Sequence, residues 1–257
     1  MTDSRFDLTG KTALITGASS GLGEHFAHVL AAAGANVVVA ARRAERLEKL
    51  VGELKTQGFQ ALAVTMDVTE SESIDAGFAA AEQRFGSVDV LINNAGIGEG
   101  IPFLKMTEGN WRSMLDTNLD GAWRVAHRAA VAMARTGTGG NIVNIASILG
   151  LRVGQGLSHY AVAKAGVVQL TKAMAIELAR DKIRVNALAP GYFRTEMNSE
   201  YFESEKGQEY IKQKVPMRRL GQLEELSGPL LLLASEAGSF ITGTVINVDG
   251  GHLSNSL

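Results

Sequence analysis

The chain has 257 residues, of which 46% are hydrophobic and 20% charged, and its formal net charge is -2 at pH 7. This balance is that of a globular protein and excludes a disordered chain. It also excludes the strongly basic face of nucleic-acid-binding proteins and the polybasic segment that favours a membrane surface. Because the chain has no cysteine, disulfides, zinc thiolates, iron–sulfur clusters and cysteine nucleophiles are excluded as well.

The N-terminal residues lack the basic and apolar regions of a signal peptide. The strongest later apolar run, Pro229 to Ala234, is far too short to span a bilayer. We therefore expect a cytoplasmic protein that binds neither membrane nor nucleic acid.

Apolar runs that are typical of β-strands alternate with helix-length segments along the whole chain. The predicted strands are 11–16, 35–40, 60–65, 88–92, 141–146, 183–189 and 244–248. The predicted helices lie at about 21–34, 44–57, 70–85, 107–134, 157–180 and 222–234. Most of the strands are continuously apolar, as strands covered on both faces should be. The pattern predicts an α/β fold: a Rossmann-type doubly wound sheet of about seven mostly parallel strands with helices on both faces.

Neither an internal repeat nor a low-complexity linker divides the sequence, so we expect a single dinucleotide-binding catalytic domain over residues 1–257. One irregular stretch, at about 192–217, is polar and aromatic and ends near Pro216. A segment that interrupts a regular α/β pattern is often a binding loop. We expect a substrate loop here, with a surface excursion or packing arm as the alternative.

A glycine-rich turn directly follows the first predicted strand and opens the first predicted helix. It runs from Thr16 to Gly23 with the spacing T-G-x-x-x-G-x-G. Glycines let the backbone turn tightly and approach a pyrophosphate, while the helix N-terminus offers free N–H groups. The residues expected to bind the cofactor here are Gly17, Ser19, Ser20, Gly21, Leu22 and Gly23. The alternative is a loop that is shaped by packing alone.

The end of the second predicted strand indicates which dinucleotide is bound. An acidic residue there usually binds the ribose hydroxyls of NAD, whereas an arginine accommodates the 2′-phosphate of NADP. The sequence has no acid at this point and continues with Arg42 and Arg43. Arginine can pair bidentately with a phosphate, so we expect NADP(H) to be preferred and NAD(H) to be possible. Two solvated charges at a helix start are the alternative interpretation.

A strand ending at Ser147 is followed thirteen residues later by Tyr160 and then by Lys164. Positions four apart share one face of a helix, so the phenol and the ammonium can point into one site. A nearby ammonium favours the phenolate and lowers the pKa of a tyrosine. General acid–base chemistry works best when that pKa approaches the working pH. The three residues therefore predict a proton-transfer site beside the dinucleotide.

The chain resembles the short-chain dehydrogenase/reductase family, in its single-domain branch, from about Leu8 to Gly251. The motifs that agree in order and spacing are the turn at 16–23, Asp67 with Val68, Asn93 to Gly96, Asn118, Ser147, Tyr160 with Lys164, and Pro190 with Gly191. The resemblance includes 3-oxoacyl-carrier-protein reductases and general ketone reductases. It implies an oxidoreductase that transfers a hydride between NADP(H) and a ketone or secondary alcohol.

The resemblance also implies a role for each matching residue. Tyr160 would exchange the proton with the substrate oxygen, Ser147 would hydrogen-bond that oxygen, and Lys164 would bind the nicotinamide ribose. Asn118 would anchor a water that extends the proton relay. Tyr160 and Lys164 would also contact the cofactor, and the remaining contacts would be Asp67, Val68, Asn94, Ala95, Gly96, Pro190, Gly191, Phe193 and Thr195. Such enzymes are usually homotetramers, with the helices near 107–134 and 157–180 packing between subunits.

The residues expected to frame the substrate are Ile148, Leu149, Gly154, Gln155, His159, Tyr192 and the 196–217 loop, with Leu149, Gln155 and Tyr192 in contact beside Ser147 and Tyr160. Their mixed character suits a small or medium carbonyl or alcohol. A 3-oxoacyl thioester remains an alternative. Against a carrier-protein substrate stands Ile176, where the carrier-specific reductases often have arginine.

Two further alternatives keep the cofactor but change the function: a non-catalytic NADP-binding regulator, and an epimerase or dehydratase. Fold alone does not decide between them. The intact Ser147, Tyr160 and Lys164 disfavour the first, and the end of the chain soon after the last strand disfavours the second. We expect no metal site, because His25 and His28 have no ligand set in the sequence pattern to complete a cage.

Overall fold

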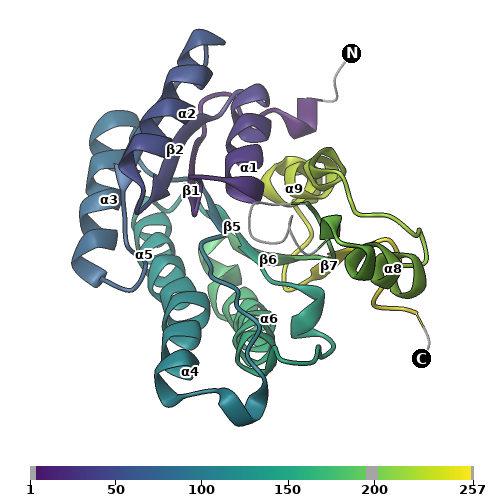
Figure 1. The fold of residues 1–257 in the computed structure, drawn as a ribbon. Helices are drawn as coiled ribbons and strands as arrows, with labels where there is room; N and C mark the ends of the chain where they lie inside the picture. The colour runs from purple at the N-terminus through teal and green to yellow at the C-terminus, as the bar shows by residue number, and fades with distance from the viewer. Residues whose placement is uncertain (1–3, 195–201, 256–257) are drawn as a thin grey trace.

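The computed structural model describes residues 4–194 and 202–255, in which seven strands form one parallel sheet (Figure 1). The order is β3-β2-β1-β4-β5-β6-β7. The strands are β1 (Thr12–Thr16), β2 (Asn36–Ala41), β3 (Ala61–Thr65), β4 (Val90–Asn93), β5 (Gly140–Ile145), β6 (Ile183–Pro190) and β7 (Val245–Val248). The order reverses between β1 and β4, which is where parallel α/β sheets open a crevice at the carboxyl ends of their strands. The predicted Rossmann-type fold is confirmed, and every strand pair is parallel.

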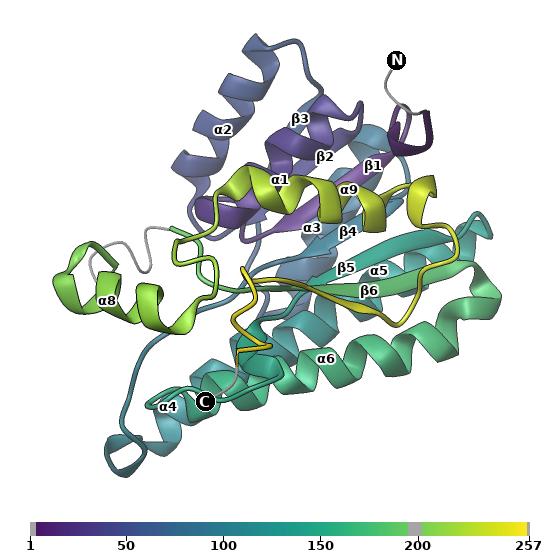
Figure 2. The ribbon, with the colours of Figure 1, turned by 90° about the vertical axis from the view of Figure 1, so that its right-hand side faces the viewer.

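Helices cover both faces of the sheet. On one face lie α1 (Gly21–Ala32), α2 (Ala44–Thr56) and α9 (Ser227–Ala234), with α1 and α9 side by side in Figure 2. On the other lie α3 (Ser71–Phe85), α5 (Gly121–Thr136) and α6 (Ser158–Leu178). The short helix α4 (Glu108–Leu115) packs on α6, and α8 (Glu205–Lys214) lies on the β7 side in Figure 1 and beyond the carboxyl ends of the strands in Figure 2.

The continuously apolar strands are explained by these two layers. Alternate residues of β1 face opposite cores, because Ile15 packs with the α1–α2–α9 layer and Leu14 with the α3–α5–α6 layer. Phe26 and Phe78, the largest fully buried side chains, anchor the two layers. Both faces of the sheet are therefore dry, and its chemistry is confined to the strand ends.

The segment predicted as one helix over 107–134 is interrupted in the structure. Between α4 and α5 the residues Asp116–Asp120 form a π-helical turn, in which Gly121 N–H donates to the Asp116 carbonyl. Local π-turns of this kind occur mostly at functional sites. Hydrophobic periodicity did not reveal it, because a one-residue bulge shifts the apolar face only slightly.

The prediction of an irregular stretch over 192–217 is wrong for its second half, which contains α8. Ser204 caps that helix by accepting a bond from Gly207 N–H at 3.1 Å. Only Gly207 and Ile211 of α8 are buried in the described chain, so its sequence is too polar to show a helical apolar stripe. Residues 195–201 of the expected substrate loop lie outside the described residues.

Among the described residues, none of the helices is both long and apolar enough to cross a membrane.

Candidate active site

A cavity of about 400 Å³ opens at the carboxyl ends of the strands, at the switch between β1 and β4. It gathers the glycine-rich turn, the ends of β2, β3, β4, β5 and β6, and one face of α6. The expected residues that line it are Gly17, Ser19, Ser20, Gly21, Leu22, Arg42, Arg43, Asp67, Val68, Asn94, Ala95, Gly96, Ser147, Tyr160, Lys164, Pro190, Gly191 and Phe193. Residues more than 170 positions apart in the sequence are thus brought to one site.

The glycine-rich turn is fixed to the neighbouring strand β4 by hydrogen bonds. The Thr16 hydroxyl accepts from the backbone N–H groups of Asn94 and Ala95, both at 3.0 Å. The Asn94 side chain donates back to the carbonyls of Thr16 and Gly17. Ser20 stands at the N-cap of α1 in extended geometry and makes no side-chain cap bond within the described residues. The first N–H groups of α1 are therefore available to an anion, as a pyrophosphate requires.

Two glycines of this turn have no room for a side chain. Gly17 has φ of +67°, and a Cβ there would lie 2.8 Å from Ala95 Cα. A Cβ on Gly23 would lie 2.4 Å from the Gly17 carbonyl oxygen and 2.6 Å from Asn94 Nδ2. Gly23 thus allows α1 to pack closely against the turn. It shapes the turn and is not among the described residues that line the cavity.

The guanidinium of Arg43 lies over the same turn. It donates to Ser19 Oγ at 2.8 Å and to Ser20 Oγ at 2.8 Å, and all three residues line the cavity. Arg42 also lines the cavity and stands close enough to Asp67 to help lower the pKa of that carboxyl. Two arginines therefore border the cavity at the end of β2. Among the described residues, no acidic residue of this strand end lines the cavity.

The side chain of Asp67 is partly committed to its own turn. Its Oδ1 accepts from Thr69 N–H at 3.0 Å and from the Thr69 hydroxyl at 2.8 Å. The backbone bond from Thr69 is the largest cause that lowers the Asp67 pKa, so the group is a carboxylate. Asp67 is thus both a turn residue and a residue that lines the cavity.

Ser147, Tyr160 and Lys164 meet at the floor of the cavity, where β5 ends and α6 begins. Ser147 Oγ accepts from Leu149 N–H at 3.1 Å, which leaves its O–H proton to be donated elsewhere. Lys164 is 5% exposed, and its ammonium donates to the Ile145 carbonyl at 2.7 Å. The Lys164 Nζ lies 5.8 Å from the centre of the Tyr160 ring. The predicted convergence of the three side chains is found.

Burial acts on the two titratable groups in opposite directions. It lowers the pKa of Lys164 to about 8. It raises the pKa of Tyr160, while the Ser147 hydroxyl acts the other way. We expected the ammonium to lower the Tyr160 pKa; in this structure desolvation of the phenolate outweighs other effects. The phenol is therefore protonated at neutral pH and suited to donate a proton.

Asn118 lies in the π-turn and is 1% exposed. Its Oδ1 accepts from Ile97 N–H and its Nδ2 donates to the Ile97 carbonyl, each at 2.8 Å. The absent side chain of Gly96 matters here, because a Cβ would lie 3.0 Å from Asn118 Oδ1 and 3.8 Å from Lys164 Nζ. Asn118 is thus a neighbour of Lys164 behind the cavity wall.

Several expected residues are not among the described residues that line the cavity: Gly23, Asn118, Leu149, Gln155 and Tyr192. Gln155 is exposed, and His159 is fully buried within α6. Thr195 lies outside the described residues. The lining residues that sequence reasoning missed are Thr16, Ala40, Ala41, Met66, Ile97, Thr117, Ile145 and Ala146. Most of these are strand-end residues whose position next to a predicted motif was the available signal.

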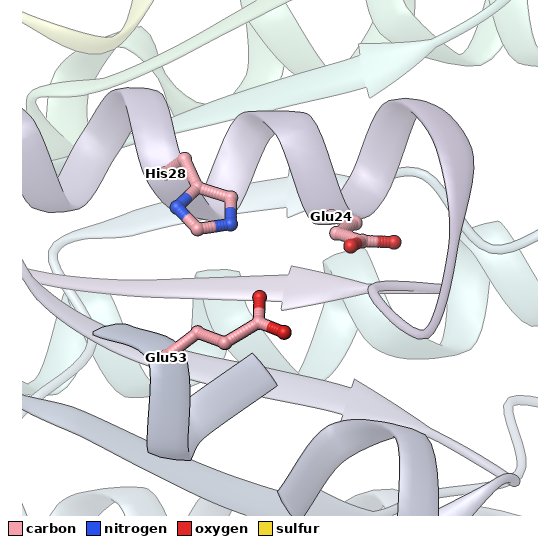
Figure 3. Close-up of side chains that lie close together, drawn as sticks. All are labelled: Glu24, His28 and Glu53. Atoms are coloured by element: carbon pink, nitrogen blue, oxygen red, sulfur yellow. The ribbon is translucent and has the colours of Figure 1, made fainter. Parts of the chain in front are cut away.

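A second group of side chains lies away from the cavity, between α1 and α2 (Figure 3). Glu24, His28 and Glu53 bring their ligand atoms within 4.8 Å of one another. The sequence pattern suggested no carboxylates for His28; the structure supplies Glu24 from the same helix and Glu53 from α2. The Lys49 ammonium stands 3.7 Å from the Glu53 carboxylate and compensates part of the charge of this group.

Comparison with known proteins places these features in context. The family model described as enoyl-(acyl carrier protein) reductase matches residues 17–252. Gluconate 5-dehydrogenase of Gluconobacter oxydans is 38% identical over 246 residues, which is 96% of each chain. The 3-oxoacyl-acyl-carrier-protein reductase of Thermotoga maritima is 37% identical over 244 residues, 95% of this chain and 98% of that one.

Among solved structures, a gluconate 5-dehydrogenase from Burkholderia cenocepacia, in complex with NADP and tartrate, superposes with a TM-score of 0.94. It is 37% identical, and the match covers 98% of this chain and 99% of that one. The likeness therefore extends over the whole sheet, its helices and the cavity.

We predict that Gly23→Ala weakens NADPH binding by about 5- to 150-fold, because overpacking a close contact costs about 1–3 kcal/mol. Gly52→Ala is the matched control, since a Cβ on Gly52 in α2 would meet none of the described atoms within 4 Å. The control should bind NADPH normally and unfold at a slightly higher temperature. Fluorescence titration of both variants measures the effect, and equal affinities would contradict the close approach of α1 to the turn.

Proposed function

The chain belongs to the short-chain dehydrogenase/reductase family and is an oxidoreductase that acts on CH–OH and C=O groups; from this premise we propose how its residues perform the reaction. The proposal rests on one cavity that contains two features. At one end lies the start of α1, whose free backbone N–H groups can bind an anion, and at the other lie Ser147, Tyr160 and Lys164. In the proposal, one catalytic domain spans residues 1–257, and its stretch at about 192–217 contributes to substrate binding.

The residues present fit a dinucleotide phosphate. Gly17 and Gly23 form a cradle that a Cβ would fill, and the start of α1 offers backbone N–H donors. When bound, NADPH supplies the hydride that passes to the carbonyl carbon. In the proposal Asp67 and Val68 hold the adenine end, Asn94, Ala95 and Gly96 the adjoining ribose, and Pro190, Gly191, Phe193 and Thr195 the carboxamide end.

Ser147 and Tyr160 bind the substrate oxygen from two sides. As negative charge develops on that oxygen during reduction, Tyr160 Oη donates its proton and Ser147 Oγ donates a hydrogen bond. The raised pKa of Tyr160 keeps the phenol protonated until this moment. For alcohol oxidation the same groups run in reverse, with Tyr160 accepting the proton.

Lys164 acts on Tyr160 and on the ribose. Its pKa of about 8 leaves the ammonium mostly protonated at neutral pH, so it can donate to a ribose hydroxyl and stabilise the phenolate that forms. Asn118, held by Ile97 beside Gly96 and Lys164, would anchor the water that returns a proton toward Lys164.

NADP(H) is the preferred cofactor, and NAD(H) remains possible. Support comes from the Arg43 guanidinium on Ser19 and Ser20, from Arg42 beside it, and from the bound NADP of the Burkholderia relative. Arginine matches a phosphate with two parallel N–H donors. A 2′-phosphate would meet both guanidinium groups at the end of β2.

The substrate is a small-molecule carbonyl or alcohol. Leu149, Gln155 and Tyr192 are proposed to line its side of the site, next to Ser147. A sugar acid, as the name of the Gluconobacter relative suggests, is one candidate, and a 3-oxoacyl thioester, as the Thermotoga relative suggests, is the other. Ile176 is 81% exposed on α6, and an apolar side chain at this surface does not attract an acidic carrier protein. This observation favours a free small molecule.

Three further points belong to the proposal. The intact Ser147, Tyr160 and Lys164 support catalysis over a purely regulatory NADP-binding role. The family resemblance supports a homotetramer that packs through α5 and α6, where Trp123 is 50% exposed. It also supports a cytoplasmic location.

We predict that Tyr160→Phe lowers kcat for carbonyl reduction by about 10²–10⁴-fold, because it removes the general acid. Consumption of NADPH is followed by absorbance with a panel of keto sugar acids, 3-oxoacyl thioesters and simple ketones. The affinity for NADPH, titrated by fluorescence, should stay within about twofold, since the phenol is not a phosphate ligand. An unchanged kcat in Tyr160→Phe would refute the assignment of Tyr160.

A second prediction concerns the choice of cofactor. Arg43→Ala and Arg42→Ala should each weaken NADPH binding by about 10- to 100-fold, since a hydrogen bond to a charged group contributes about 1.5–3 kcal/mol. NADH binding should not change. Lys55→Ala removes the same charge from the far end of α2 and serves as control. Equal losses for NADPH and NADH would mean that the arginines do not read the 2′-phosphate.

A further inference from the structure

Four aromatic rings form a cluster beside the active site, at the start of the expected substrate region. Tyr192 stands at the centre, with Phe202, Tyr210 and His252 around it at ring-centre distances of 5.1, 5.7 and 5.2 Å. The hydroxyls of Tyr192 and Tyr210 lie 3.2 Å apart. Distances and tilts of this kind are those of favourable aromatic pairs. The cluster joins the end of β6, helix α8 and the C-terminal residues.

His252 comes from a C-terminal turn, residues 249–255, that is built on α8 and its exit. The Gly250 carbonyl accepts from Met217 N–H at 3.1 Å, and Asn255 Nδ2 donates to the Lys214 carbonyl at 3.0 Å. The Asp249 carboxylate closes the turn by accepting from the N–H groups of Gly251 and Leu253. These bonds hold the turn against the segment that follows α8.

Two glycines let this turn lie close to that segment. Gly250 and Gly251 have φ of +62° and +85°, a region that L side chains rarely adopt. A Cβ on Gly250 would lie 3.0 Å from Val215 Cγ1, and one on Gly251 would lie 3.1 Å from Pro216 Cγ. The backbone therefore places His252 directly against the cluster.

The same turn is bound to the segment that carries the catalytic serine. Arg152 donates from Nη1 to the His252 carbonyl. Arg152 in turn donates its backbone N–H to the carbonyl of Ile148, the residue after Ser147, at 2.9 Å. The C-terminal turn thus links two segments that flank the cavity: the one that follows Ser147 and the one that holds Tyr192 and α8.

The His252 side chain contacts the aromatic cluster through its ring. It is 3% exposed, and its buried Nδ1 has no hydrogen-bond partner among the described residues. Burial is the largest cause that lowers the pKa of His252, so the imidazole is neutral. A neutral ring packed on Tyr192 contributes by contact area and stacking.

We propose that His252 is a positioning residue for the reaction: it fixes the Tyr192 ring against α8 and thereby shapes the wall that the substrate meets. Tyr192 directly follows Pro190 and Gly191, which line the cofactor cavity. A change in the position of the Tyr192 ring would therefore move the backbone of its neighbours in the site. This inference rests on the proposed function, because it needs a substrate beside Tyr192.

The size of the effect follows from the stacking contact. Aromatic pairs contribute about 0.5–1.5 kcal/mol beyond the burial of area, which corresponds to about 2- to 10-fold in an equilibrium constant. If the wall is correctly ordered for only part of the time, the apparent affinity for substrate falls by that fraction. KM should therefore rise, whereas kcat and NADPH affinity should not change.

The test compares three variants of the full chain with the wild type: His252→Ala, His252→Phe and His127→Ala. His252→Phe keeps a ring on Tyr192 and removes the unpartnered nitrogen. His127 stacks on Trp123 at 5.4 Å on α5, away from the cavity, so His127→Ala controls for the loss of an aromatic pair. KM and kcat are measured with the best carbonyl substrate of the panel, NADPH affinity by fluorescence, and amide hydrogen exchange over α8.

For His252→Ala we expect KM to rise about 2- to 10-fold with kcat within about twofold, and α8 to exchange faster. His252→Phe should restore both, and His127→Ala should change neither. The proposal is overturned if His252→Ala leaves KM and exchange unchanged, if His252→Phe is as impaired as His252→Ala, or if kcat and NADPH affinity fall together with KM. If the wild type reduces no compound of the panel, the proposed function fails, while exchange over α8 still reports whether His252 holds that wall.

Discussion

The parallel pairing of β1 with both β2 and β4 is the constraint on which the site depends. β1 precedes β4 by more than seventy residues, yet Leu14 pairs with Leu91 and Ile15 with Ile92. This register brings the end of β4 beside the glycine-rich turn, where Thr16 and Asn94 exchange hydrogen bonds. That contact fixes both the start of α1 and the close approach of α1, at Gly23, to the glycine-rich turn. Because every strand runs the same way, β5 and β6 deliver Ser147 and Pro190 to the same edge.

The second constraint is a buried cation at the floor of the cavity. The Lys164 ammonium is out of water and is held by the Ile145 carbonyl, so burial lowers the pKa of Lys164 to about 8. The same burial raises the pKa of Tyr160. Burial thus pushes the two pKa values apart, which keeps the Tyr160 phenol protonated as the proton donor and makes the Lys164 ammonium the readier group to release a proton. In the proposed reaction, Lys164 would bind a ribose hydroxyl of the cofactor, and Tyr160 would donate its proton to the alkoxide that develops on the substrate.

Much of this could be predicted from the sequence, because the strands are continuously apolar and the motifs stand at their ends. Ser147, Tyr160 and Lys164 were predicted from their spacing together with the strand that ends at Ser147 and the glycine-rich turn upstream, because the spacing of Tyr160 and Lys164 by itself is common by chance. The π-turn at Asn118 was not, since hydrophobic periodicity tolerates one extra residue in a helix turn. Helix α8 was missed because it packs a separate small cluster with Phe202 and Val215. The contact of His252 with Tyr192 depends on tertiary structure, as local patterns cannot show which rings a C-terminal turn will meet.

The central claim is direct hydride transfer to a carbonyl carbon with Tyr160 as proton donor. It is tested most directly by supplying NADPH that carries deuterium at the nicotinamide C4 and analysing the alcohol product by mass spectrometry and NMR. We predict one deuterium on the carbinol carbon when the label stands on one face of the nicotinamide, and none when it stands on the other face. A product that carries its new hydrogen from water at carbon, or consumption of the substrate without any label in the product, would contradict the account.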